Sequence, residues 1–242
     1  WEHQFFRRHS RGLYLTSLWL GTALGAFVSY LLMIPLPLLP LFLLIWSELM
    51  RHALRRTVRR LHAPRILPRM EIQSLPEKWR TLVVCPTLLT SAAQAMSMVR
   101  HLMILRYANP DEQLHFMLLA DFADSITAEQ VSDQEILSAA KAGIEALCQE
   151  FGGGFSYLQR ARAFNQQEKM YMGRERKRGA LEALNRMLLG LPVEDTFLYA
   201  SRPLEEFANQ YAYVITLDSD TILPPGSAYR LIGAMAHPLQ KR

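Results

Sequence analysis

The first feature of the chain is a long apolar run. Residues 13–33 carry no charged side chain, and about 21 residues at about 1.5 Å each roughly match a hydrocarbon core about 30 Å thick. A second apolar run, at 36–46, follows Pro35 and is interrupted by Pro37 and Pro40. Proline lacks the amide donor and disfavours helix for the residue before it, so we expect the chain to turn here. The pattern therefore predicts a transmembrane helical hairpin.

Arginines lie on both sides of this hairpin. They are Arg7, Arg8 and Arg11 before the first run, and Arg51, Arg55, Arg56, Arg59 and Arg60 after the second. Positive residues stay on the cytoplasmic side, so both flanks are expected there, with membrane lipids as partners of the basic segment. The alternatives are a buried core hairpin and a signal peptide, although the run is longer than a signal-peptide core. We assign 1–62 to the hairpin with its basic flanks and 63–80 to a linker.

From residue 81 onward, short apolar runs alternate with segments whose apolar side chains recur at helical spacing. The runs suit strands buried on both faces, and the intervening segments suit crossover helices. We predict strands at 81–85, 114–120, 155–158 and 211–217, and helices at 91–106, 133–151 and 178–189. This order predicts an α/β domain over 81–242, with a mostly parallel, Rossmann-like sheet flanked by helices. Ligands of such sheets bind at the carboxyl ends of the strands.

Composition and charge narrow the class of protein. Hydrophobic residues make up 50% of the chain, and many of them lie in the apolar runs near the amino terminus. The net charge is +5, but the arginines adjoin the hairpin and no nucleic-acid motif is present, so nucleic acid is not expected as a partner. Cys85 and Cys148 belong to no close cysteine and histidine array of the kind that binds zinc. A membrane-anchored protein with its domain in a reducing compartment fits best.

Two aspartates directly follow the predicted strand at 211–217. Asp218 and Asp220 flank Ser219, so one or both carboxylates could emerge at the sheet edge and share a Mg²⁺ or Mn²⁺ ion. A metal that bridges the oxygens of a nucleotide diphosphate stabilises the charge that builds as this leaving group departs. An aspartate pair after a strand is also a common turn or helix cap, so the motif alone leaves both interpretations open.

Other polar residues lie at expected strand ends or at the start of a helix. Lys177 and Arg178 begin a predicted helix, where cations and free amides hold phosphate, although a solvated helix start has the same pattern. Asp121 follows the second strand, where it could accept hydrogen bonds from a uracil ring or a ribose, or form a turn. Pro86 and Thr87 lie at the end of the first strand. Several such features at one sheet edge favour a nucleotide-binding site.

The order of these segments resembles that of the GT-A glycosyltransferases, and the details are similar to the cyclic β-1,2-glucan synthases. The resemblance covers nearly all of residues 65–242. Its segments are ILPRM at 66–70, TLVVCPTLLTS at 81–91, LHFMLLADFAD at 114–124, MGRERKRGALEALN at 172–185, YVITLDSDTILP at 213–224 and GAMAHPL at 233–239. Together they are far more specific than a lone D-x-D pair.

The resemblance implies a GT-A-like fold and a processive, inverting transferase that uses UDP-glucose and Mg²⁺ or Mn²⁺ to elongate a β-1,2-glucan. By position, the implied ligands are Asp218 and Asp220 for the metal and diphosphate, Asp121, Pro86 and Thr87 for the uridine, and Lys177 and Arg178 near the nucleotide. The growing glucan and the remainder of a longer synthase polypeptide would be partners. Such a synthase would be a multi-pass protein of the bacterial inner membrane, with its transferase domain on the cytoplasmic side.

An inverting transfer needs a general base that takes the proton from the acceptor hydroxyl as it attacks the anomeric carbon. In related transferases this is an acidic residue well downstream of D-x-D, near a Q-x-x-R-W motif, and neither is recognisable in this sequence. We therefore expect the N-terminal part of a transferase region, truncated at its C-terminus, that transfers no glucose alone. The alternatives are a related synthase of different linkage and a non-catalytic, membrane-anchored nucleotide-binding or interaction module.

Overall fold

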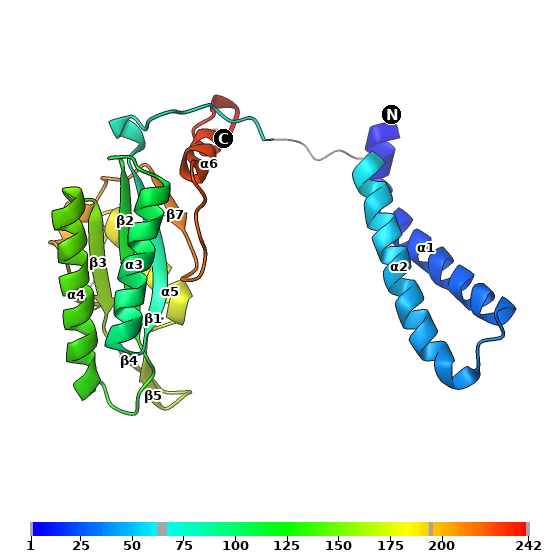
Figure 1. Ribbon diagram of the computed structural model, residues 1–242, viewed down its shortest axis with the longest axis horizontal. Helices are drawn as coiled ribbons and strands as arrows, with labels where there is room; N and C mark the ends of the chain where they lie inside the picture. Colours follow the sequence, from blue (N-terminus) through cyan, green and yellow to red (C-terminus); the bar gives the residue numbers. More distant parts are fainter. Residues whose placement is uncertain (1, 62–66, 194–195, 241–242) are drawn as a thin grey trace. The chain divides into compact units, whose positions relative to one another are not determined.

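Two compact units make up the chain (Figure 1). The computed structural model describes residues 2–61, 67–193 and 196–240. The smaller unit is Trp1–Leu67 and the larger is Pro68–Arg242. The predicted linker at 63–80 falls across this boundary, because the chain from Pro68 onward belongs to the larger unit. Residues 62–66 lie outside the described part of the chain.

The smaller unit is a pair of helices. Its elements are α1 (Glu2–Leu31), the 3-10 helix η1 (Leu36–Leu38) and α2 (Leu39–Leu61). The two long helices approach closely at glycines of α1. The indole N–H of Trp46 donates to the carbonyl of Gly21 at 2.8 Å, and a Cβ on Gly25 would lie 2.3 Å from the Trp46 ring. α1 ends before the prolines, whereas Pro37 lies within η1 and Pro40 in the first turn of α2, so the chain turns where the sequence predicts.

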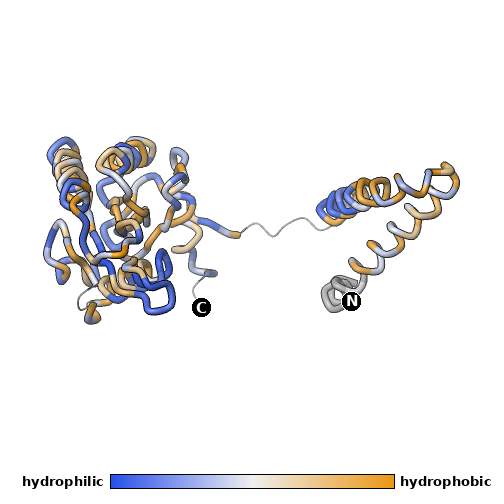
Figure 2. The backbone as a smooth tube through the Cα atoms, turned by 90° about the horizontal axis from the view of Figure 1, so that it is seen from below, coloured by the Kyte–Doolittle hydropathy of each residue, from blue (hydrophilic) through white to orange (hydrophobic). Residues whose placement is uncertain are grey.

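One helix of this unit is long and apolar enough to cross a membrane, by length and composition. The window Tyr14–Leu31 has a mean hydropathy of 1.2, and 17% of it is buried. Its large side chains face outward, with Trp19 75% and Tyr30 80% exposed. Figure 2 shows the hairpin as mostly hydrophobic apart from hydrophilic positions in the second half of α2. The arginines occupy the second half of α2, so a crossing by both helices stays a prediction.

The larger unit is built on a five-stranded sheet with the order β6-β3-β2-β1-β7. Its strands are β1 (Thr81–Leu89), β2 (Leu114–Phe122), β3 (Phe155–Arg160), β6 (Phe197–Ala200) and β7 (Tyr213–Thr216). All neighbours are parallel except β6, which pairs with β3 in the antiparallel direction. The predicted α/β fold with a mostly parallel sheet is therefore confirmed.

Helices cover both faces of this sheet. They are α3 (Ala92–Ala108), α4 (Val131–Phe151), α5 (Arg176–Leu188) and α6 (Ser227–Met235). Figure 1 shows α3 and α4 side by side on one face, whereas α5 and the 3-10 helix η3 (Leu204–Phe207) pack on the other. Alternate residues of a strand point to opposite faces. In β2, Phe116 thus joins the core under α3 and α4, and Met117 joins the core under α5.

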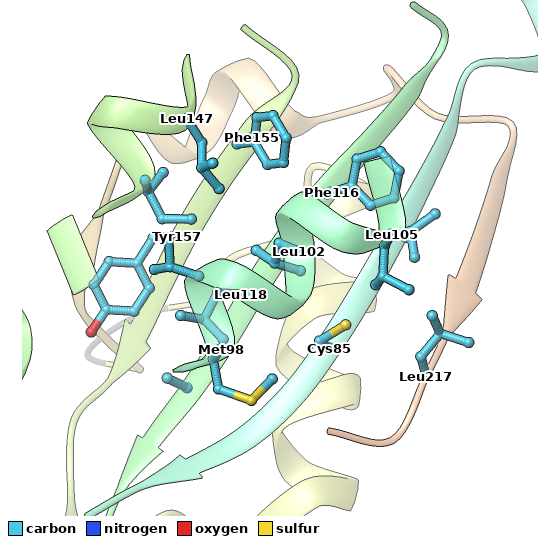
Figure 3. Close-up of a cluster of buried hydrophobic side chains, with 14 of the residues drawn as sticks. Cys85, Met98, Leu102, Leu105, Phe116, Leu118, Leu147, Phe155, Tyr157 and Leu217 are labelled. Atoms are coloured by element: carbon cyan, nitrogen blue, oxygen red, sulfur yellow. The ribbon is translucent and has the colours of Figure 1, made fainter. Parts of the chain in front are cut away.

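The core under α3 and α4 is the larger of the two. Figure 3 shows Leu102 and Leu105 of α3 close to Phe116 of β2. Phe116 also stacks on Phe155 of β3, with ring centroids 5.7 Å apart. Cys85 is fully buried in this cluster, and burial raises the pKa of its thiol to about 12. Cys85 is therefore a packed apolar side chain and not a reactive thiol.

The elements that the sequence pattern misses are short. They are β6, α6, the hairpin of β4 (Ala163–Asn165) and β5 (Met170–Met172), and the 3-10 helices η2 (Glu77–Trp79), η3 and η4 (Pro238–Gln240). Strands of three or four residues are too short for an alternating pattern to be distinguished from a loop. β6 is defined instead by its pairing with β3, which is distant in sequence, and β4 and β5 are defined by their pairing with each other.

The segment that follows Pro68 is held to the α/β unit by backbone hydrogen bonds. The Met70 N–H donates to the carbonyl of Gly233 in α6 at 3.0 Å. Leu75 is buried, and its N–H donates to the Asp111 carboxylate at 2.9 Å. Residues 68–80 thus lead directly into β1 as part of the larger unit.

His115, near the start of β2, makes the stability of this fold depend on pH. Its Nδ1 lies 2.9 Å from the Tyr211 hydroxyl. Burial, followed by the charges of Arg80, Arg202 and Arg106, lowers the pKa of its imidazole from 6.5 to about 4. Between these values the unfolded chain binds more protons than the folded one. The free energy of unfolding should therefore fall as the pH drops from about 6.5 toward 4.

Denaturant unfolding of the full chain between pH 7 and pH 4 tests this expectation. The His115→Gln variant should show a shallower pH dependence than the wild type, because it lacks the titrating imidazole. The His237→Gln variant is the matched control and should follow the wild-type curve. Equal slopes for His115→Gln and the wild type would assign the pH dependence to other groups.

Candidate functional site

The carboxyl ends of the parallel strands are shaped by a proline inside β1. The Leu217 N–H donates to the carbonyl of Val84 at 2.9 Å, so Val84 faces β7. Every second residue of a strand faces the same neighbour, which turns Pro86 toward β7 as well. Pro86 has no N–H to donate, and β7 ends at Thr216, the Cα partner of Val84. The missing donor therefore explains why the chain leaves the sheet at Asp218.

The point at which the chain leaves is a topological switch point. β2 and β3 lie on one side of β1, and β7 lies on its other side. In open α/β sheets, ligands bind in the crevice outside the carboxyl ends of the strands at such a point. Thr87 is partly buried in β1 there, and Asp218 follows β7. The topology thus places these two predicted residues at the edge where a ligand is expected.

The first turn of α5 has an unusual backbone. Glu175 and Arg176 both adopt positive φ angles, of 52° and 50°, which non-glycine residues rarely adopt. No side chain caps this end of α5. Gly179 is required by close packing, because a Cβ there would lie 2.0 Å from the carbonyl oxygen of Arg174. The loop before α5 is therefore tightly constrained, and the helix end is left without a side-chain acceptor.

Ion pairs join this turn to two different strand ends. Lys177 pairs with Asp218, which follows β7. Arg176 donates to the Asp124 carboxylate, beyond β2, at 2.8 Å. These pairs are mostly exposed, so each contributes little to stability. Their effect is to bring the basic start of α5 between the ends of β2 and β7.

Arg178 lies in a different place. Its guanidinium is 3.4 Å from the Glu175 carboxylate within the same turn, and its side chain is 83% exposed. Arg178 therefore points to solvent beside Lys177 and contacts neither predicted aspartate of the D-x-D motif in its described contacts.

Asp121 is the predicted site residue whose surroundings differ most from expectation. Its two carboxylate oxygens accept hydrogen bonds from the Arg160 guanidinium, at 2.7 and 2.6 Å. The side chains of Arg160 and Asp121 are 2% and 12% exposed. This carboxylate therefore has a buried structural partner, and its predicted contact with uridine remains a prediction.

The D-x-D aspartates are open to solvent. Asp218 has a side chain 64% exposed and is paired with Lys177, and Asp220 is exposed with no hydrogen bond to another described residue. Within the described ranges, no group of three or more His, Cys, Asp or Glu residues could hold a metal ion. Mg²⁺ is commonly bound by one or two carboxylates, with waters and substrate phosphates completing the shell. The two aspartates fit a metal held in that manner.

A cavity of about 580 Å³ lies beside the same helix turn, lined by Arg160, Arg174, Glu175, Gly179, Glu182 and neighbouring residues. It includes neither Asp218 nor Asp220. The ion pairs and strand ends therefore define the candidate site better than the size of this cavity does.

Sequence reasoning missed Arg160 and Arg176. Arg160 ends β3, one strand over from Asp121, and an arginine at the end of a short buried strand could have suggested a partner for a buried carboxylate. The sequence contains no comparable sign of the contact made by Arg176, since the positive φ of that residue sets the direction of its side chain.

Comparison with known proteins identifies the class of this α/β protein. No family model matches the chain. It is 36% identical over 174 residues, or 70% of its length, to the cyclic beta-(1,2)-glucan synthase NdvB of Rhizobium meliloti (strain 1021). The chain spans about 6% of the length of that synthase. This similarity confirms the predicted resemblance. It supports a glycosyltransferase-related role for this chain, which corresponds to a small part of the synthase.

The packing at Gly179 generates a testable prediction. In Gly179→Ala the new Cβ meets the Arg174 carbonyl, and overpacking of this kind costs about 1–3 kcal/mol. This exceeds the gain of about 1 kcal/mol in helix propensity. The free energy of unfolding, measured with denaturant, should therefore decrease.

Asn185→Ala is the matched control, because Asn185 is an exposed residue of the same helix. Its substitution should leave stability unchanged or raise it by a few tenths of a kcal/mol, roughly the difference in helix propensity. A Gly179→Ala variant as stable as Asn185→Ala would mean that the loop before α5 is not held in the position described.

Proposed function

We propose that the larger unit is the nucleotide-sugar-binding part of a membrane glycosyltransferase that uses UDP-glucose to elongate a β-1,2-glucan. The single observation that supports this most is the convergence of Lys177 and Asp218 at the β1–β7 switch point. A cation and a carboxylate at the ligand-binding edge of a parallel sheet suit a nucleotide diphosphate with its metal. The similarity to a cyclic glucan synthase supports glucose as the sugar and β-1,2 as the linkage.

In this proposal each predicted residue has a distinct role. Asp218 and Asp220 hold Mg²⁺ or Mn²⁺, which supplies charge neutralisation for the departing diphosphate. Lys177 exchanges its pairing with Asp218 for a phosphate oxygen when the nucleotide binds. Pro86 and Thr87 lie in the carboxyl-terminal half of β1, beside which the uridine would be placed.

Arg178 and the amides at the start of α5 add positive potential to the same edge. The side chain of Arg178 is exposed, so it can reach a phosphate without breaking a buried contact. Asp121 contributes through its charge and position near the uridine, while its carboxylate oxygens remain bound to Arg160.

The inverting step itself requires a general base that removes the proton of the acceptor hydroxyl. We propose that the remainder of the synthase polypeptide supplies this base, and that this chain contributes binding and charge stabilisation. The acceptor is the growing β-1,2-glucan.

The smaller unit has a separate role in the proposal. Its apolar, outward-facing helix crosses the bacterial inner membrane, and α2 completes a hairpin within a multi-pass protein. The arginines at 51–60 contact anionic lipid headgroups on the cytoplasmic side. The nucleotide-sugar site would then face the cytoplasmic pool of UDP-glucose.

Calorimetric titration of UDP into the full chain in mild detergent, with Mn²⁺ present, tests the proposed site. The wild type should bind UDP in a metal-dependent manner, with binding lost in EDTA. Asp220→Ala should weaken binding by at least about tenfold, equivalent to about 1.4 kcal/mol, because a carboxylate ligand of the metal is removed.

Glu135→Ala is the control, since Glu135 is an exposed acid of α4 whose loss should leave the affinity for UDP unchanged. Metal-dependent binding of equal strength in wild type and Asp220→Ala would assign Asp220 a structural role. ADP in place of UDP tests base selectivity, and equal affinities for the two would contradict a uridine site.

A further inference from the structure

We propose that Arg160 is a positioning residue: it sets the conformation of residues 173–178, so that the basic start of α5 is directed at the diphosphate. This inference rests on the proposed function for its ligand and on the structure for its geometry. Arg160 lies at the carboxyl end of β3 and contacts no predicted ligand of the metal in its described contacts. It acts through the backbone of the loop before α5.

The Arg160 guanidinium makes contacts on two sides. Toward β2, Nε and Nη2 donate to the two oxygens of Asp121, at 2.7 and 2.6 Å. Toward the loop, Nη1 donates to the carbonyl of Arg174 at 3.1 Å, and Nη2 donates to the carbonyl of Arg176 at 2.9 Å. A planar guanidinium with several fixed donors can bind a carboxylate and two carbonyls at once, whereas a lysine ammonium cannot reproduce this geometry.

The contacts of Arg160 lie on both sides of the strained residues. Glu175 stands between the two bound carbonyls, and Glu175 and Arg176 have positive φ angles. A conformation of this kind persists only when surrounding contacts hold it. Because both carbonyls turn inward to Arg160, residues 174–176 are fixed immediately before Lys177. Lys177 then reaches Asp218 across the switch point.

Gly173 completes this arrangement. A Cβ at position 173 would lie 2.6 Å from an Asp121 carboxylate oxygen and 2.9 Å from Arg160 Nη2. The loop therefore passes directly over the ion pair, and only glycine allows the approach. An alanine there would displace the loop without removing any charge, which provides a second variant independent of Arg160.

Arg162 offers a matched control two residues along the chain. Its side chain is also 2% exposed, and it also binds both oxygens of one aspartate, Asp133. Its other contacts are the carbonyls of Ala123 and Ala128 and the ring of Phe122. Arg162 therefore shares the burial and the ion pair of Arg160 but makes no described contact with the loop at 173–178.

Hydrogen exchange of the full chain in detergent, without ligand, measures the order of the loop. Arg160→Lys keeps the charge next to Asp121 but loses the two carbonyl contacts. Exchange within 174–178, followed at the Arg176 amide that donates to the Gly173 carbonyl, should therefore accelerate by at least about tenfold. Gly173→Ala should produce the same local acceleration. Arg162→Lys should leave exchange at 174–178 at the wild-type rate.

Calorimetry with uridine and with UDP in the presence of Mn²⁺ separates positioning from general destabilisation. If Arg160 only supported the fold, Arg160→Lys would weaken both ligands equally. If it positions the basic loop, the ratio of UDP affinity to uridine affinity should fall by about tenfold, because the loss is confined to the phosphate. Arg162→Lys should keep the wild-type ratio.

The possible outcomes are distinct. Faster exchange at 174–178 together with a lower UDP-to-uridine ratio, in Arg160→Lys and not in Arg162→Lys, supports the inference. Unchanged exchange at 174–178 in Arg160→Lys overturns it. If the wild type binds nucleotide, an unchanged ratio of UDP affinity to uridine affinity in Arg160→Lys overturns it as well. If the wild type binds neither ligand, the proposed function fails, and exchange alone then decides whether Arg160 orders the loop.

Should Arg160→Lys fail to fold, Gly173→Ala takes its place in both measurements. It leaves Arg160 and Asp121 present and alters only the approach of the loop. Wild-type exchange and a wild-type ligand ratio in Gly173→Ala would count against the inference in the same manner.

Discussion

The buried ion pair between Arg160 and Asp121 links the sheet to the helix that carries the basic residues. The two side chains come from the carboxyl ends of neighbouring parallel strands. A third segment of the chain, the loop before α5, passes this edge of the sheet and can hydrogen-bond there. Arg160 uses that position to bind the carbonyls of the loop before α5. A buried charge is tolerated only when it is paired and hydrogen-bonded, so the loop and the ion pair depend on each other. The placement of Lys177 relative to β7 follows from this dependence.

A second constraint acts from the opposite side of the switch point. Pro86 lacks the N–H that would extend the ladder between β1 and β7, and the chain turns away after Thr216. Asp218 is thereby left beyond the end of β7 and not within a longer strand. The two constraints have different physical origins, one an ion pair and the other a missing hydrogen-bond donor, yet they direct Lys177 and Asp218 to the same edge. The exposed pair that results is weak, as a contact must be if a ligand is to replace it.

Much of the fold could be predicted from the sequence, since apolar runs of four to seven residues between amphipathic segments identify buried parallel strands. β6 could not, because four residues that pair antiparallel to β3 carry no distinctive pattern. The candidate site was predictable only as residue types at strand ends. The partner of Asp121 was not, because the pairing joins residues far apart in sequence. Local motifs specify which groups are present, and the tertiary fold decides which of them remain available to a ligand.

The contrast between Asp121 and Asp218 makes this point in chemical terms. Asp121 lies near the end of β2, and Asp218 follows β7. The sequence predicts that both contact a nucleotide or its metal. Asp121 is buried with two guanidinium hydrogen bonds, so releasing its carboxylate would leave Arg160 as an unpaired buried charge, at a cost of several kcal/mol, roughly 3–5. Asp218 is 64% exposed and paired with a lysine on a flexible stem, so its release costs about 0–1 kcal/mol. Under the proposed function, a divalent metal with a nucleotide diphosphate would therefore recruit Asp218 by exchanging one exposed cation for another, whereas Asp121 would keep its pairing with Arg160.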